Sequence, residues 1–224
     1  MTENDIMNRP WIAAFVSLPD IFTITNGILG FLAIYHILIG NILLASRIVF
    51  LCIFFDSFDG FLARRKNNCA EFGKTLDSLS DIISFGIVPS LIFISYGDNG
   101  ILSLSIGAIY VISGLLRLSR FNALNSQEYF GLPITLGAIF VTLLFLAEIP
   151  FYLYSTLLIV TSALFISNFK IIRPSNSEKF LVIFSTLFVF ISLIPYPPIL
   201  IVSRVLLILL PCIFLLYLFR AHQS

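Results

Sequence analysis

Long apolar runs limit, more than any other feature, what this chain can fold into. The 224 residues are 58% hydrophobic and only 11% charged, whereas a soluble domain usually carries about 25% charged residues. The apolar runs are close to the ~20 residues that a helix needs to cross a bilayer. The sequence therefore predicts an all-α integral membrane protein built as one helical bundle.

Clusters of Gly, Pro, Asn and Asp separate the apolar runs and are typical of loops. Residues 1–20 precede the first run and are expected to form a short interfacial helix, with Trp11 at headgroup depth. We predict six helices over residues 21–168 and two further helices in residues 169–224. The eight predicted transmembrane helices are 21–40, 42–65, 73–96, 101–122, 131–148, 151–168, 179–195 and 198–219.

Most Lys and Arg residues fall at one end of the eight predicted spans. The loops at the other end, near residues 41, 98, 149 and 196, carry none. Because cytoplasmic loops are enriched in Lys and Arg, both termini and this basic end are expected to face the cytoplasm. The sequence thus predicts a multi-pass protein of the cell membrane. The residues that decide this are Arg9, Arg64, Arg65, Lys66, Lys74, Arg117, Arg120, Lys170, Arg173, Lys179 and Arg220.

Several classes of protein fit the sequence poorly. A net charge of +1 offers no basic surface for nucleic acid. The three cysteines show no CxxC pattern, so no disulfide framework is expected. The first residues include Glu3 and Asp5 and lack a basic start, so no cleavable signal peptide is expected. We find no internal repeat, which disfavours a transporter built from two inverted halves.

Four aspartates interrupt the apolar pattern: Asp56, Asp59, Asp77 and Asp81, within the stretch DSFDGFLARRKNNCAEFGKTLDSLSD. A carboxylate in hydrocarbon costs several kcal/mol unless something compensates it. The first two aspartates are three residues apart and the last two are four apart, so each pair shares one helix face. A short loop joins the two helices, so the pairs can face each other across the helix interface.

Four carboxylates around one small volume form a site for a hard divalent cation. Oxygen ligands favour Mg²⁺ or Mn²⁺ over Zn²⁺, and two ions are expected because four negative charges would still repel one another around one. Gly60 and Ala63 are small enough to let a ligand approach the backbone. Arg64 supplies a fork for phosphate, and Gly73 keeps the start of the next span open.

Each of these residues also has a structural interpretation when taken alone. A single aspartate at a helix end is usually a cap, and Gly or Ala in a membrane helix usually means close helix packing. The combination of four aspartates in register with Gly, Ala, Arg and Gly favours a metal–diphosphate site.

At these residues the sequence resembles the CDP-alcohol phosphotransferase family. The family signature is D-x2-D-G-x2-A-R-x8-G-x3-D-x3-D, and it matches without departure at Asp56, Asp59, Gly60, Ala63, Arg64, Gly73, Asp77 and Asp81. The resemblance implies a six-helix core with a polar cavity facing the cytoplasm, a two-metal site and a homodimer. It also implies transfer of a phosphatidyl-type group from a CDP-linked lipid to an alcohol, with release of CMP.

Within the family, three further stretches resemble the phosphatidylserine synthase members. They are LPDIFTITNGILGFLAI at 18–34, LDSLSDIISFGIVPS at 76–90, and LLRLSRFNA at 115–123 followed by FGLP at 130–133. This resemblance implies L-serine as the acceptor and CDP-diacylglycerol, or the archaeal CDP-archaeol, as the donor. The residues leave the type of lipid tail open.

The resemblance also implies roles for individual residues. Asp56, Asp59 and Asp77 would be metal ligands. Asp81 would be the general base and would also contact the second ion, while Gly60, Ala63 and Arg64 would hold the CMP part. Asn26 lies in the middle of an apolar span and has two interpretations, a lining residue of the nucleotide pocket or an interhelical hydrogen bond.

Arg117, Arg120 and Asn122 are the candidates for binding the serine carboxylate. The two arginines are three residues apart on one face of the fourth span, near the level of the aspartates. The alternative is that they extend to lipid headgroups at the membrane surface.

Two rival functions remain open at this point. Another member of the family could use glycerol 3-phosphate or inositol phosphate, but a phosphorylated acceptor would call for more basic residues than Arg117 and Arg120. A divalent cation channel or transporter would also place carboxylates in the membrane, but it would not explain the Gly, Ala and Arg spacing.

Overall fold

The computed structural model describes residues 16–63, 70–97, 100–124, 129–168 and 170–171. Its helices are α2 (Leu18–Leu38), α3 (Ile42–Ala63), α4 (Ala70–Asp81), the π-helix η2 (Ile82–Ile87), α5 (Val88–Tyr96), α6 (Ile101–Ala123), α7 (Ile134–Leu146) and α8 (Phe151–Ile166). Helices are present at the first six predicted spans, with bounds that agree to within three residues at each end. The predicted interfacial helix falls mostly outside the described residues, and the two C-terminal spans fall wholly outside them, so a total of eight stays a prediction.

Local signals explain where several helices begin. Ser17 precedes α2, and its N–H and hydroxyl both donate to the Asp20 carboxylate, at 2.6 and 2.7 Å. The contact of the Ser17 N–H with Asp20 belongs to a capping box, an arrangement that satisfies groups which the first turn leaves without partners. Asn41 begins α3 in a similar way, because its side-chain oxygen accepts a hydrogen bond from the N–H of Leu44 at 3.2 Å. Helices α7 and α8 follow Pro133 and Pro150.

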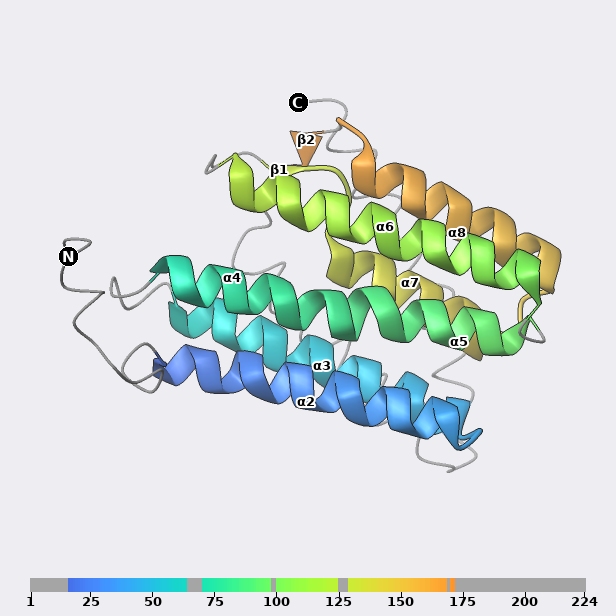
Figure 1. Ribbon diagram of the computed structural model, residues 1–224, viewed down its shortest axis with the longest axis horizontal. Coiled ribbons are helices and arrows are strands. Elements are labelled where there is room, and N and C mark those ends of the chain that lie inside the picture. The colour runs from blue at the N-terminus through green and yellow to red at the C-terminus, as the bar shows by residue number, and fades with distance from the viewer. Residues whose placement is uncertain (1–15, 64–69, 98–99, 125–128, 169, 172–224) are drawn as a thin grey trace.

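The helices form one bundle with their axes roughly along its long direction (Figure 1). α2 packs mainly against α3, and α6 packs mainly against α8. Between these two pairs runs one continuous rod made of α4, η2 and α5, which contacts α2, α6 and α7. The end of α3, the start of α4 and the end of α6 therefore lie at the same end of the bundle.

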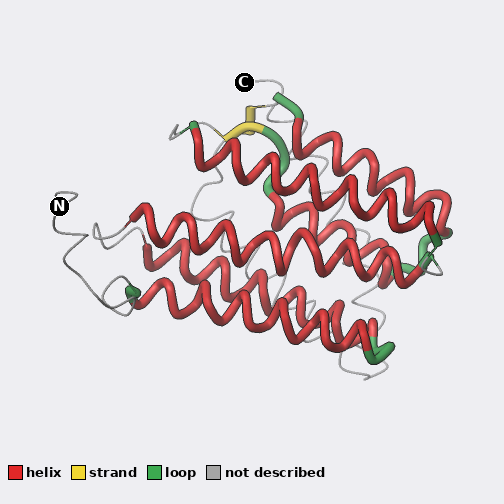
Figure 2. The backbone as a smooth tube through the Cα atoms, in the orientation of Figure 1, coloured by secondary structure: helices red, strands yellow, loops and turns green. Residues whose placement is uncertain are grey.

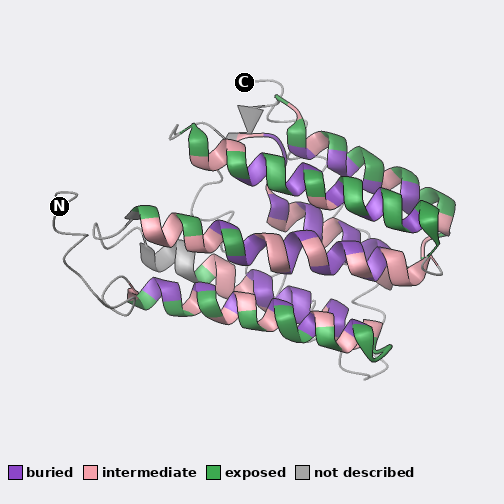
Figure 3. Cartoon of the chain, in the orientation of Figure 1, coloured by how far each residue is buried: buried purple, intermediate pink, exposed green. Residues whose placement is uncertain are grey.

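The outer surface of the bundle is apolar. α2, the rod from Glu71 to Tyr96, and α6 are each long and apolar enough to cross a membrane, and α7 and α8 are shorter apolar helices. Large apolar side chains point outward, with Leu18, Ile28 and Phe31 each more than half exposed. Figure 3 shows exposed residues along the outer faces of α2 and α6 and buried residues on their inner faces. An apolar exterior of this kind suits lipid contact, and the predicted helical bundle is confirmed for the described residues.

Two features were not predicted. β1 (Tyr129–Phe130) and β2 (Lys170–Ile171) form a two-residue antiparallel ladder beside the ends of α6 and α8 (Figure 2). The rod also contains the π-helix η2, where the N–H of Val88 bonds to the carbonyl of Ile83, five residues back. The buried hydroxyl of Tyr110 on α6 donates to the carbonyl of Phe85 in this segment, at 3.1 Å. π-helical turns inside α-helices often occur at functional sites, and this one follows Asp81 directly.

Candidate active site

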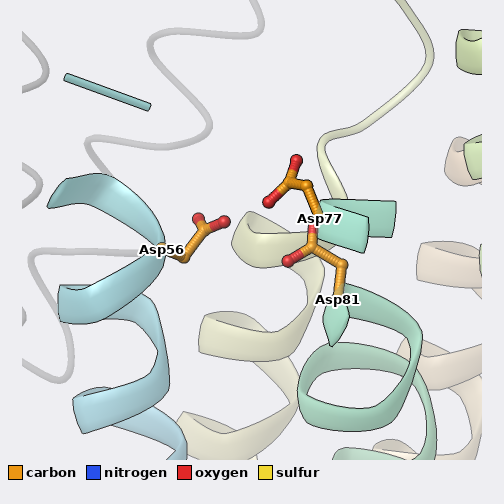
Figure 4. Close-up of side chains that lie close together, drawn as sticks. All are labelled: Asp56, Asp77 and Asp81. Carbon is orange, nitrogen blue, oxygen red and sulfur yellow. The ribbon is translucent and has the colours of Figure 1, made fainter. Parts of the chain in front are cut away.

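Three of the four predicted aspartates come together at one end of the bundle. One carboxylate oxygen from each of Asp56, Asp77 and Asp81 lies within 4.8 Å of the other two. Asp56 projects from α3, and Asp77 and Asp81 project from α4 toward it (Figure 4). Asp56 and Asp77 are partly exposed, whereas Asp81 is 7% exposed. The predicted convergence across the helix interface is confirmed for these three residues.

The donor set fits a divalent metal ion. Carboxylate oxygens are the ligands that hard cations such as Mg²⁺ and Mn²⁺ prefer. Three carboxylates this close repel one another strongly in the low dielectric of a membrane protein, and a bound cation removes that repulsion.

The remaining residues of the signature are less well placed by the structure. Asp59, Gly60 and Ala63 continue α3 beyond Asp56, but their side chains lie outside the described set. Arg64 lies outside the described residues altogether. Their roles as metal ligand and CMP-binding residues stay predictions.

Asn26 links α2 to the aspartate cluster. Its side chain is fully buried, and its Nδ2 donates to Oδ1 of Asp81 at 3.4 Å. The interhelical hydrogen bond expected as one interpretation of Asn26 is therefore present. A role in the nucleotide pocket stays a prediction.

Gly73 lies where α4 passes close to the start of α2. A Cβ atom at Gly73 would sit 2.9 Å from Oδ1 of Asp20. Because Asp20 is buried and holds the α2 cap, a larger residue would push against a fixed carboxylate. The open space predicted at Gly73 is thus filled on one side by Asp20, and contact with a diphosphate stays a prediction.

Polar residues of α6 approach α4 beside Asp77. Arg117 is 8% exposed and interacts electrostatically with Asp77. Asn122 exchanges hydrogen bonds with Ser78, the residue after Asp77, and its Nδ2 donates to Ser78 Oγ at 3.0 Å. Lys74 was not predicted as a site residue, but its Nζ donates to the carbonyls of Phe121 and Asn122 at 3.1 and 3.4 Å. Lys74 lies one turn before Ser78, but only the packing of α4 against α6 shows that it faces this interface.

Arg120 lies in a different setting from Arg117. Its guanidinium donates to the carbonyls of Phe130, Phe165, Ile166 and Ser167 and to Oδ1 of Asn168, at 3.0–3.3 Å. Gly131 has φ +72°, and a Cβ there would lie 2.7 Å from the guanidinium. Arg120 therefore ties the end of α8 to the segment after α6. Its predicted contact with serine stays a prediction that these hydrogen bonds do not favour.

Replacing Arg120 with alanine is expected to destabilise the protein. The carbonyls at the end of α8 would lose these exposed and part-buried hydrogen bonds, and a hydrogen bond to a charged group typically contributes about 1.5–3 kcal/mol. A loss of about 2 kcal/mol would lower the melting temperature in detergent by roughly 4–8 °C. The melting temperature of Arg120→Lys should lie between those of Arg120→Ala and the unmodified protein, because lysine keeps the charge but lacks the planar fork. An unchanged melting temperature with a raised KM for serine would instead indicate that Arg120 binds the serine carboxylate.

Comparison with known proteins decides the family. The family model for CDP-alcohol phosphatidyltransferases matches residues 16–172, which is more than half of the chain. This chain belongs to the CDP-alcohol phosphatidyltransferase family. The matched region contains every helix described above and all residues of the predicted site, which makes the chain a phosphatidyl-transferring enzyme. Members of the family generally depend on divalent metal ions, in agreement with the aspartate cluster.

Several relatives are similar over most of their length. An archaetidylserine synthase from Methanothermobacter thermautotrophicus is 34% identical over 171 residues, covering 74% of this chain and 73% of the relative. A CDP-diacylglycerol–serine O-phosphatidyltransferase from Methanocaldococcus jannaschii is 36% identical over 176 residues, covering 78% and 82%. One from Helicobacter pylori is 32% identical over 193 residues, covering 79% and 80%. The predicted resemblance to the serine-transferring members is confirmed.

Proposed function

We propose that this CDP-alcohol phosphatidyltransferase moves a phosphatidyl-type group from a CDP-linked lipid to the hydroxyl of L-serine and releases CMP. The donor is CDP-diacylglycerol or CDP-archaeol. The observation that carries the proposal is the similarity to relatives named for serine transfer, which extends over about three quarters of this chain. The carboxylates of Asp56, Asp77 and Asp81 support it by providing the metal-binding chemistry that a diphosphate donor needs.

The aspartates have separate roles in this reaction. Asp56, Asp59 and Asp77 would hold Mg²⁺ or Mn²⁺, and Asp81 would contact a second ion. When bound, the ions neutralise the diphosphate and stabilise the CMP leaving group. Asp81 accepts the proton of the serine hydroxyl as the serine oxygen bonds to the lipid-side phosphorus and the phosphorus–oxygen bond to CMP breaks. Gly60, Ala63, Arg64 and Gly73 line the space for the CMP part.

Arg117 is the favoured ligand for the serine carboxylate. Its buried guanidinium beside Asp77 lies next to the aspartate cluster, and a guanidinium pairs well with a carboxylate. Asn122 supports this side of the site through its hydrogen bonds to Ser78. Lys74 adds a positive charge on the same helix interface.

The setting of the enzyme follows from the charge pattern. We propose a multi-pass protein of the cell membrane with eight transmembrane helices, and with the active site and both termini on the cytoplasmic side. Residues 21–168 form the catalytic core and residues 169–224 contribute the last two helices. A homodimer is expected from the family resemblance.

A test of the acceptor measures CMP release by the purified enzyme with CDP-diacylglycerol or CDP-archaeol and Mn²⁺. Serine is expected to support release at a rate at least ten times that with glycerol 3-phosphate or inositol phosphate, because the acceptor side offers few positive charges. Mass spectrometry should then find serine linked through phosphate to the lipid. Release with a phosphorylated acceptor alone would contradict serine specificity, and no release with any acceptor would contradict the enzyme function.

A further inference from the structure

Asn26 has a polar side chain that is buried in the interior of the bundle, where an unpaired polar group costs free energy. It lies in the middle of α2, is 0% exposed, and has an Oδ1 atom that finds no hydrogen-bond partner among the residues that the structure describes. A buried polar atom without a partner costs about 1–3 kcal/mol. An apolar residue at this position would avoid that cost, so the amide needs a reason other than stability.

The backbone of Asn26 is held from two other elements. Its carbonyl accepts a hydrogen bond from the hydroxyl of Ser84 in η2 at 3.0 Å and from the thiol of Cys52 in α3 at 3.7 Å. One turn away, the hydroxyl of Ser80 donates to the carbonyl of Thr23 at 2.8 Å. α2, α3 and the central rod are thus joined at the level of Asn26, which leaves its side chain little freedom to move.

From this hydrogen-bonded backbone, the side-chain amide of Asn26 extends to the aspartate cluster. A carboxylate only accepts hydrogen bonds, so the NH₂ end of the amide must face Asp81. The Nδ2–Oδ1 distance of 3.4 Å is longer than the usual ~2.9 Å for this type of bond. Catalytic hydrogen bonds are often long before substrate binds and shorten afterwards.

We propose that Asn26 is a positioning residue for Asp81. Its NH₂ group holds the Asp81 carboxylate in the orientation that metal binding and proton transfer require, and the contacts of the Asn26 carbonyl with η2 and α3 keep the amide in place. Partners that orient a metal ligand in this way typically contribute about 10–100-fold to metal affinity or activity. The inference rests on the proposed role of Asp81 and replaces the expected role of Asn26 in the nucleotide pocket.

The test uses two substitutions that preserve the shape of Asn26. Asn26→Leu removes both the donor and the side-chain oxygen, and Asn26→Asp replaces the donor with a carboxylate oxygen and adds a negative charge. Both variants are expected to lower kcat for CMP release about 10–100-fold at saturating Mn²⁺, while KM for the CDP-lipid changes less than about twofold. Mn²⁺ binding, followed by electron paramagnetic resonance of the solubilised protein, should weaken by up to about tenfold in Asn26→Leu.

Ser84→Ala is the matched control. It removes a buried hydrogen bond to the same residue, from the Ser84 hydroxyl to the Asn26 carbonyl, and leaves the donor to Asp81 in place. We expect a lower melting temperature, and losses of kcat and Mn²⁺ binding well below those in Asn26→Leu, because the contacts of Cys52 and Ser80 with α2 remain. Equal losses of kcat in Ser84→Ala and Asn26→Leu would mean that Asn26 acts through packing, and would overturn the proposal.

Other outcomes would distinguish positioning of Asp81 from nucleotide binding and from charge repulsion. A raised KM for the CDP-lipid with an unchanged kcat in these variants would indicate that Asn26 lines the nucleotide pocket. Loss of activity in Asn26→Asp alone would point to charge repulsion and would contradict the role of the donor. CMP release by the unmodified enzyme is measured in parallel with each acceptor, and a low rate with serine would show that serine is not the acceptor. Mn²⁺ binding needs no acceptor, so it tests the positioning role of Asn26 independently.

Discussion

Asp81→Asn is expected to lower CMP release by at least about 1000-fold. The substitution keeps the shape of the side chain but removes the group proposed to accept the serine proton, and general bases typically contribute about 10²–10⁴-fold. Loss of a charge that faces the metal site adds to this effect. The measurement is the rate of CMP release with CDP-lipid, serine and Mn²⁺ at saturating concentrations.

Binding of the CDP-lipid to the same variant separates chemistry from recognition. Asp56 and Asp77 remain, so titration calorimetry with the CDP-lipid and Mn²⁺ should give an affinity within a few-fold of the unmodified enzyme. Turnover close to normal in Asp81→Asn would remove Asp81 from the base role. A complete loss of CDP-lipid binding would make Asp81 mainly a metal ligand.

Asp77→Asn is expected to weaken Mn²⁺ binding and activity together, each by more than about 100-fold. Losing an outer partner of a metal ligand already costs about 10–100-fold, and Asp77 is proposed to bind the metal directly. The substitution also removes a negative charge beside the buried Arg117, so the melting temperature should fall as well. Electron paramagnetic resonance reports Mn²⁺ binding, and CMP release reports activity.

Glu71→Gln is the matched control for this prediction. Glu71 is an exposed carboxylate in the first turn of the same helix, and the substitution makes the same change in charge. It should leave both Mn²⁺ binding and CMP release close to normal. Equal effects of Glu71→Gln and Asp77→Asn would mean that only the overall charge at this end of the bundle matters, and would contradict a direct metal–Asp77 bond.

Residue spacing was enough to predict the central part of the site. Pairs of aspartates three and four residues apart on two consecutive helices leave few ways to arrange the carboxylates, and three of the four meet as expected. The first six helices were also predictable, because their apolar runs and the Gly, Pro and Asn residues between them are local signals.

The contacts made by α6 could not be predicted in the same way. Arg117 and Arg120 are equivalent in the sequence, one turn apart on the same helix. Only the packing shows that Arg117 faces Asp77 while Arg120 faces the end of α8. That difference depends on the position of α8, which lies more than 30 residues further along the chain. The hydrogen bond from Asn26 to Asp81 joins residues that are 55 positions apart, so no local pattern could distinguish it from other interhelical contacts.

The π-helix Ile82–Ile87 has a consequence for changes in chain length. A π-helical turn holds one residue more than the α-helical turn it replaces, and each residue of an α-helix turns the following ones by about 100°. Deleting one residue from this segment would restore a uniform α-helix and leave Asp77 and Asp81 facing nearly the same direction relative to α5, because the wider turn has absorbed the extra residue. Deleting one residue from the start of α5 would instead rotate the two carboxylates by about 100° relative to Ile92 and Phe93, which lie in the core. The π-helix should thus accept a single-residue deletion more readily than α5 does.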